Sequence, residues 1–331
     1  MWLQFGLVSV LLSGLLTGVV FWLSPGHSLL RSTTSSNEVF PFPHHRPTNN
    51  NRPVIGILTQ PNEFGGEYIA ASYVKFVEAS GARVVPIRYW WSDRELQTVF
   101  RGINGVLLPG GGASLDPQDT VMIRPAQILY DLAQKQNKLV PNSFFLFGVC
   151  LGWEILAVVA SKDATILKES GQYDNHGLAK PLQQVDSHSQ LFRDLDSKLT
   201  KKKLFYHSHA MGVSPEMFRL KFDSCWKTVA TGQDERGKRF IAAAESHCAP
   251  YFGLQFHPEK NLFEWKSGAD IPHQLEATQV TLHFVRLLAE LGRRTRQGNF
   301  NERDIFARAI ENTPVVTVGD SYFFQVYNFT E

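Results

Sequence analysis

Short apolar runs alternate with stretches of helical spacing from residue 53 onward. The runs are VIGIL (54–58), RVVPI (83–87), GVLLP (105–109) and FFLFG (144–148), and their branched and aromatic content is typical of buried strands. Helical spacing covers 68–80, 93–100 and 121–136, and Gly81 is placed to cap the first helix. The alternation predicts an α/β fold with a parallel sheet covered on both faces. Functional groups are then expected at the carboxyl ends of the strands.

A different pattern fills the amino-terminal 52 residues. Residues 2–23 are almost wholly apolar, and the first thirty contain no Asp, Glu, Lys or Arg. We interpret 1–24 as a secretory signal and favour its cleavage, although about 20 apolar residues are also enough for an uncleaved anchor. Residues 25–52 are rich in Ser, Thr, Asn, Pro and His, which predicts a disordered linker. The folded domain is therefore expected over 53–331.

Composition narrows the class of protein. The chain has 331 residues, of which 43% are apolar and 19% charged, as in ordinary globular proteins. Its net charge of +2, from 33 basic and 31 acidic side chains, leaves no excess to hold a phosphate backbone. Nucleic acid is not expected as a partner.

A cysteine between two glycines, GVCLG (148–152), stands where the fourth predicted strand gives way to a helix. This is the form of a nucleophile elbow, in which small neighbours permit a strained turn that lifts the nucleophile above the sheet. The following helix points its amino terminus at Cys150, which is expected to lower the thiol pKa. The N–H of Leu151 is a natural oxyanion donor, and a second is expected in the glycine loop 110–112, which follows the third strand. A lone cysteine is usually a buried, unreactive core residue, so a catalytic role for Cys150 requires a second catalytic residue.

That partner is offered by YFGLQFHPEK (251–260), a predicted strand followed by His257 and Glu259. A thiol nucleophile requires a base, and the base requires a group that orients it. The spacing of two residues lets the Glu259 carboxylate hold the imidazole in one tautomer. We therefore predict that Cys150, His257 and Glu259 form a catalytic triad.

Several motifs together resemble a known family. PGGG (109–112), GVCLGWE (148–154) and GLQFHPE (253–259) are similar to the class I glutamine amidotransferase-like fold, a three-layer, flavodoxin-like sandwich with a Cys-His-Glu triad. RPVIGILTQP (52–61), YHSHAMGVSPEMF (206–218), FHPEKNLFEW (256–265) and FFQVYNF (323–329) resemble the γ-glutamyl hydrolases more narrowly. The likeness extends over essentially all of 53–329.

The resemblance implies a cysteine-type omega peptidase that cleaves folylpoly-γ-glutamates and related γ-glutamyl peptides through a thioester. It implies no metal or organic cofactor, a small-molecule substrate and a homodimer, with no stable membrane contact if the signal is cleaved. Within the glycine loop after the third strand, we assign Gly111 and Gly112 to the oxyanion hole and Gly110 to the substrate site. A further histidine of the family's active site matches His207 by position. His209 competes for that role, and an edge-strand pair without function is an equal alternative.

Glu154 lies four residues after the candidate nucleophile. Relatives in the wider superfamily often carry Gln at this place, and a carboxylate here can pair with a substrate α-ammonium group. An acidic residue favoured by the helix dipole is the competing interpretation.

The remaining cysteines, Cys225 and Cys248, flank a predicted hairpin whose turn is 234–237. They are placed to face each other across antiparallel strands, so a disulfide is expected in an oxidising compartment; two reduced thiols are the alternative. A glycosylation sequon begins at Asn328. These features and the signal predict the secretory pathway, with the lysosome, vacuole or extracellular space as destination.

Two other function classes stay open from the sequence. One is a glutaminase unit of an amidotransferase, which the secretory signal disfavours. The other is a non-catalytic member of the fold, which the intact Cys150, His257 and Glu259 disfavour.

Overall fold

The computed structural model describes residues 50–62, 66–116, 121–295, 298, 300–318 and 322–329. The expected signal or anchor at 1–24 and most of the expected linker at 25–52 lie outside the described residues. In the described part of the chain, no helix is both long and apolar enough to cross a membrane.

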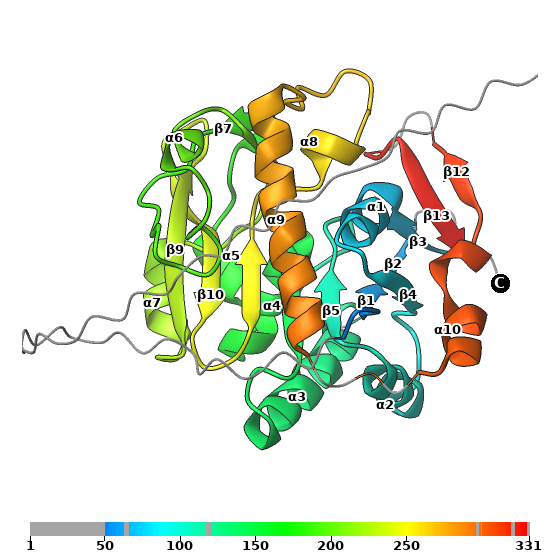
Figure 1. Cartoon of the computed structure of the whole chain (residues 1–331). Helices are drawn as coiled ribbons and strands as arrows, with labels where there is room; N and C mark the ends of the chain where they lie inside the picture. The colour runs from blue at the N-terminus through cyan, green and yellow to red at the C-terminus, as the bar shows by residue number, and fades with distance from the viewer. Residues whose placement is uncertain are drawn as a thin grey trace, which may run out of the picture. The chain divides into compact units, whose positions relative to one another are not determined.

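A seven-stranded sheet forms the centre of the fold, in the order β4-β1-β5-β6-β11-β10-β9 (Figure 1). Its strands are β1 (Val54–Leu58), β4 (Arg83–Ile87), β5 (Gly105–Leu108), β6 (Phe145–Val149), β9 (Trp226–Gln233), β10 (Arg239–Ser246) and β11 (Tyr251–Leu254). Neighbours from β4 to β11 run parallel, whereas β10 is antiparallel to both β11 and β9. The sheet is thus the mostly parallel one expected, and its first four predicted strands end within one residue of their predicted bounds.

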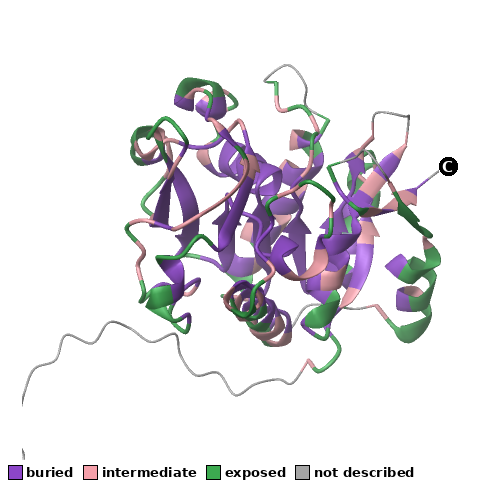
Figure 2. Cartoon of the chain, turned by 90° about the horizontal axis from the view of Figure 1, so that it is seen from above, coloured by how far each residue is buried: buried purple, intermediate pink, exposed green. Residues whose placement is uncertain are grey.

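Alternation along the strands produces the two outer layers, because successive side chains point to opposite faces. Ile55 and Ile57 share a core with helices α1 (Ala71–Ala79) and α9 (Leu275–Arg294). Val54 and Leu58 share a second core with α2 (Asp93–Gly102), α3 (Ile123–Leu139) and α4 (Leu151–Ser161). The central strands are buried on both sides (Figure 2). This is the three-layer sandwich that the motifs implied.

A smaller sheet corrects one helix prediction. Its order is β12-β13-β3-β2, with β2 (Gln60–Pro61), β3 (Glu67–Ala70), β12 (Val315–Thr317) and β13 (Gln325–Phe329). The expected helix over 68–80 therefore begins only at Ala71, because the residues before it pair with β13 from the far end of the chain. The predicted end is right, since Gly81 follows α1 with φ +76°.

The remaining elements are short. Strands β7 (Asn175–Lys180) and β8 (Phe205–His209) form a separate antiparallel pair. The short helices are α5 (Ile166–Ser170), α6 (Ser197–Thr200), α7 (Pro215–Lys221), α8 (Lys260–Phe263), α10 (Glu302–Arg308) and the 3-10 turn η1 (Ile310–Asn312).

Candidate active site

Cys150 occupies a strained turn between β6 and α4. Its φ of 52° and ψ of −114° are uncommon for a residue with a side chain, as expected of a nucleophile elbow. The flanking glycines make the turn possible: a Cβ on Gly148 would lie 2.6 Å from the carbonyl oxygen of Gly152, and one on Gly152 would lie 1.8 Å from that of Leu108. The elbow form predicted from the sequence is therefore present.

The environment of the sulfur contradicts the expected low thiol pKa. Burial raises the pKa of Cys150 well above its ordinary value, and Glu154 raises it further. The N–H of Leu151 donates to the sulfur and lowers the pKa, as the helix terminus should, but this effect is smaller than that of burial. Cys150 is 5% exposed, and its thiol lies 3.8 Å from the carbonyl oxygen of Ser208. The resting residue is thus a thiol that needs a base to become a nucleophile.

His257 and Glu259 come together in the turn after β11. Nδ1 of His257 lies 2.8 Å from Oε1 of Glu259, and the backbone N–H of His257 donates to Tyr206 at 2.9 Å. Because the carboxylate accepts from Nδ1–H, the neutral ring carries its lone pair on Nε2. Burial lowers the pKa of His257, while Glu259 opposes this. A neutral imidazole with its lone pair on Nε2 is the form required of a general base.

Gly110 brings this pair and the cysteine to one place. A Cβ on Gly110 would lie 2.9 Å from Cε1 of His257, 3.1 Å from Cβ of Cys150 and 2.4 Å from Oη of Tyr73. All three side chains therefore border the same glycine, and any larger residue at 110 would displace them. Gly112 lies in open space, whereas Gly111 packs on Gln60.

Tyr73 is a member of this cluster that the sequence reasoning missed. It lies on α1, is fully buried, and places Oη 3.1 Å from Nδ1 of His257. The Gly110 N–H donates to the same oxygen. Burial and the nearby Glu259 raise the pKa of Tyr73 well above its ordinary value, so the phenol keeps its proton. The signal in the sequence was a phenol hydroxyl among the mostly apolar positions of the predicted helix.

Glu154 is paired inside the protein. Nε2 of Gln255 donates to Oε1 of Glu154 at 2.9 Å, and both residues are buried. Burial raises the pKa of Glu154 to about 7, with Gln255 lowering it. Among the described residues, Oε1 of Gln255 has no hydrogen-bond partner. Position 154 is thus a buried polar site close to Cys150, and it also lies in the first turn of α4, as the competing interpretation has it.

His207 and His209 form a buried chain on β8. The Nδ1 atom of His209 lies 2.7 Å from the Met211 carbonyl, and Nε2 lies 2.9 Å from Asn175 and 3.3 Å from Nδ1 of His207. Burial lowers the pKa of both rings, that of His209 to about 3. Both are neutral, and His207 is wholly enclosed. No group of three metal-binding side chains occurs in the part of the chain that the structure describes.

The two other cysteines are joined. Cys225 and Cys248 form a disulfide with an S–S distance of 1.99 Å, just outside the hairpin of β9 and β10. Asn328 lies within β13, half-buried, and accepts a hydrogen bond from Asn62 at 3.2 Å. A paired strand is not the surface loop in which a sequon is usually modified.

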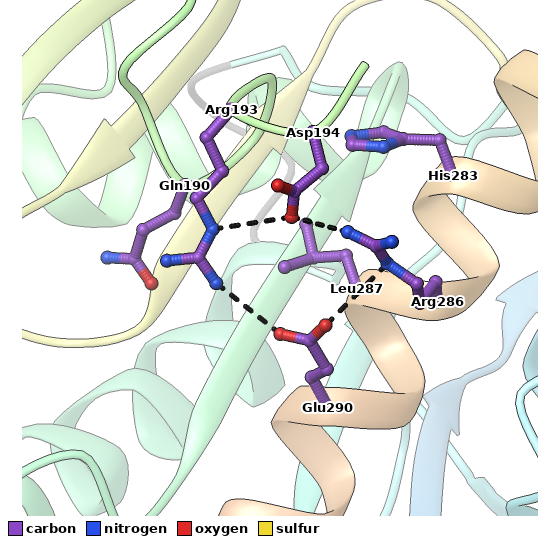
Figure 3. A pocket seen from close by; sticks show the side chains of 7 residues that line it. All are labelled: Gln190, Arg193, Asp194, His283, Arg286, Leu287 and Glu290. Carbon is purple, nitrogen blue, oxygen red and sulfur yellow. Dashed lines mark hydrogen bonds and ion pairs between the residues drawn. The ribbon is translucent and has the colours of Figure 1, made fainter. Parts of the chain in front are cut away.

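A hollow against α9 contains none of these residues. Figure 3 shows its charged side chains paired with one another: Arg193 with Glu290 at 3.4 Å, and Arg286 with Asp194. Its volume of about 10 Å³ admits little more than one water molecule. It is an ion-pair network that holds a loop to a helix.

Comparison with known proteins identifies the class first. The family model for "Glutamine amidotransferase class-I" matches residues 68–268, which include Cys150, His257 and Glu259.

Individual relatives define a narrower family within this class. Gamma-glutamyl hydrolase 1 of Arabidopsis thaliana is 33% identical over 264 residues, covering 75% of this chain and 74% of its own. Gamma-glutamyl hydrolase of Mus musculus is 32% identical over 292 residues, which cover 84% of this chain and 90% of the relative. Gamma-glutamyl hydrolase B of Dictyostelium discoideum is 29% identical over 295 residues, which cover 85% of this chain and 84% of the relative. The chain belongs to the γ-glutamyl hydrolase family.

Proposed function

We propose that this protein hydrolyses γ-glutamyl bonds, using Cys150 as nucleophile, His257 as acid and base, and Glu259 to orient His257. The observation that carries the proposal is the meeting of the elbow cysteine and the His257–Glu259 pair at Gly110. Family membership supports the same activity, since the relatives are named for it.

The reaction follows from the protonation states in the site. Nε2 of His257 takes the proton of the Cys150 thiol as the sulfur attacks the γ-carbonyl carbon, forming an S–C bond. His257 then gives that proton to the departing nitrogen as the C–N bond breaks, which leaves a γ-glutamyl thioester. Water, deprotonated by His257, attacks the thioester carbon, and cleavage of the S–C bond returns the thiol and releases the γ-carboxylate. No cofactor is needed to balance these steps.

The developing oxyanion needs donors close to the sulfur. The Leu151 N–H already donates to the sulfur of Cys150, so it lies where the oxygen of the attacked carbonyl would arrive. We assign the second donor to the glycine loop, with Gly111 as the residue whose peptide is held in place by Gln60.

Recognition of the γ-glutamyl half is assigned to Glu154. When ionised, its carboxylate can bind the α-ammonium group of the substrate, and Gln255 steadies it and offers the unpartnered Oε1 as a further acceptor. The bond attacked is then the γ-amide, because the α-ammonium is held away from the sulfur. Folylpoly-γ-glutamates are the substrates we expect, from the sequence resemblance.

The test compares poly-γ-glutamate, an α-linked polyglutamate of the same length and free glutamine as substrates, with products read by mass. Cleavage of the γ-linked chain alone is the predicted result. Turnover of glutamine alone would assign the protein to the glutaminases, and no turnover of any substrate would leave a non-catalytic member of the fold.

We place the protein in the secretory pathway, leading to the lysosome, vacuole or extracellular space. The Cys225–Cys248 disulfide supports an oxidising compartment, as does the apolar segment at 2–23. Sequencing of the mature amino terminus tests whether that segment is removed. A homodimer belongs to the same proposal, and sedimentation of the purified protein tests it.

A further inference from the structure

Lys260 is a buried cation at the edge of the candidate active site. It is the first residue of α8 and directly follows Glu259, so the turn that carries His257 and Glu259 also fixes its position. Only 5% of Lys260 is exposed. Lysine is seldom buried this far without a partner, which makes its surroundings informative.

Two aromatic rings contact the ammonium group. Nζ of Lys260 lies 4.8 Å from the ring centre of Phe323 and 5.6 Å from that of Tyr206. Tyr206 belongs to the site as well, because its ring centre is 6.2 Å from that of His257 and its carbonyl accepts from the His257 backbone. One tyrosine ring therefore adjoins both the imidazole and the ammonium group.

Each neighbouring carboxylate has one oxygen bound elsewhere, whereas Oε2 of Glu259 has no hydrogen-bond partner among the described residues. Oε1 of Glu259 accepts from His257 at 2.8 Å, and Oε1 of Glu264 accepts the Phe324 backbone N–H at 2.7 Å. Within the described ranges, neither carboxylate reaches Lys260 closely enough for an ion pair of 4.0 Å. Both nevertheless act on it at longer range and oppose the effect of burial on its pKa. Lys260 is thus a cation with aromatic contacts and without a direct counter-ion among these residues.

This arrangement suits an anion that arrives with the substrate. A desolvated ammonium group binds a carboxylate more strongly than a solvated one does, and aromatic walls leave its N–H groups without competing acceptors. His257 must reach the departing nitrogen, so the leaving group lies beside the imidazole. In a γ-glutamyl peptide that leaving group is an amino acid, which carries a carboxylate. In glutamine it is ammonia, which carries none.

We infer that Lys260 binds a carboxylate of the leaving amino acid and so makes the enzyme select γ-glutamyl peptides over γ-glutamyl amides with an uncharged leaving group. The inference rests on the proposed function and adds the residue that sets its leaving-group specificity. Glu154 would hold the acyl half by its ammonium group, and Lys260 would hold the departing half by its carboxylate.

The experiment uses the full chain and two substrates that differ in one group: γ-glutamyl-β-alanine and γ-glutamyl-propylamide. Lys260→Met removes the charge and nearly keeps the length of the side chain, whereas Lys260→Arg keeps the charge. Lys266→Met serves as the control, because Lys266 is a neighbouring lysine that lies over a ring of its own, that of Tyr322.

For Lys260→Met we expect kcat/KM to fall about tenfold or more with the carboxylate-bearing leaving group, mainly through KM, and to stay within about twofold with the propylamide. Lys260→Arg should restore most of the preference, and Lys266→Met should keep it. Equal losses on both substrates would show a structural role and overturn the inference, as would no loss on either.

A second test uses the wild-type enzyme alone, so its result does not depend on whether a variant folds. It should favour γ-glutamyl-β-alanine over the propylamide by about tenfold. Equal rates on the two would overturn the role of Lys260 while leaving γ-glutamyl hydrolysis intact. Failure to cleave either substrate would instead contradict the proposed function itself.

Discussion

Nδ1 of His257 lies 2.8 Å from Oε1 of Glu259, with one proline between the two residues. The contact fixes which ring nitrogen carries the proton, and hence which one can accept the proton of the thiol. Glu259→Ala should lower kcat by roughly 10²–10⁴-fold with a smaller change in KM, because acid–base transfer by His257 depends on that tautomer. Steady-state hydrolysis of γ-glutamyl-glutamate measures this. An unchanged kcat would mean that Tyr73, at 3.1 Å, orients the ring alone.

The pH dependence of kcat/KM and of kcat should distinguish the ionisation of Glu154 from that of His257. The ratio kcat/KM reports the free enzyme, in which burial raises the pKa of Glu154 to about 7. It should therefore fall as the pH decreases through about 7, where the carboxylate that receives the α-ammonium takes up a proton. The parameter kcat reports the bound enzyme, and it should persist below pH 6.5, because burial lowers the pKa of His257 from that ordinary value. Glu154→Gln should lower kcat/KM and abolish the decrease of kcat/KM near pH 7. If that decrease remains in the variant, a group other than Glu154 causes it.

Gln60 should fix the orientation of the peptide groups in the glycine loop 110–112. Its Nε2 donates to the carbonyls of Pro109 at 3.0 Å and Gly110 at 3.1 Å. In a trans peptide the carbonyl and the next N–H point in opposite directions, so holding the Gly110 carbonyl also aims the Gly111 N–H. Gln60→Ala should lower kcat by about tenfold or more and leave KM little changed, as loss of an oxyanion donor does. A rise in KM alone would contradict this role.

The disulfide should contribute to stability without affecting catalysis. Cys225 and Cys248 are 23 residues apart; Cys225 directly precedes the edge strand β9, and Cys248 follows its neighbour β10. Replacing both by Ser should lower the free energy of unfolding by about 2–4 kcal/mol, because the unfolded chain regains the freedom that the link removes. Thermal unfolding with and without a reducing agent measures the effect. Hydrolysis at a temperature where the variant is folded should match that of the native protein.

Local pattern predicted the strands and the elbow because both are short-range features. Glycines at 148 and 152 mark the turn at Cys150, and apolar runs mark strands buried on both faces. Pairing over long distances was not predictable in this way. Glu67–Ala70 became a strand only because β13 lies beside it, and Tyr73 joined the site only because α1 packs next to Gly110. The direction of the Cys150 pKa was wrong for a related reason. A helix terminus can be read from sequence, but the burial that outweighs it depends on the whole fold.

The central claim is that Cys150 is the nucleophile of a γ-glutamyl hydrolase. It is tested most directly by the rate at which γ-glutamyl-glutamate is cleaved by the native protein, by Cys150→Ala and by the Cys225→Ser, Cys248→Ser control. We expect the native protein and the control to release glutamate. In Cys150→Ala we expect a loss of roughly 10⁴-fold or more, comparable to removal of other nucleophiles. Undiminished release by a folded Cys150→Ala protein would contradict the claim.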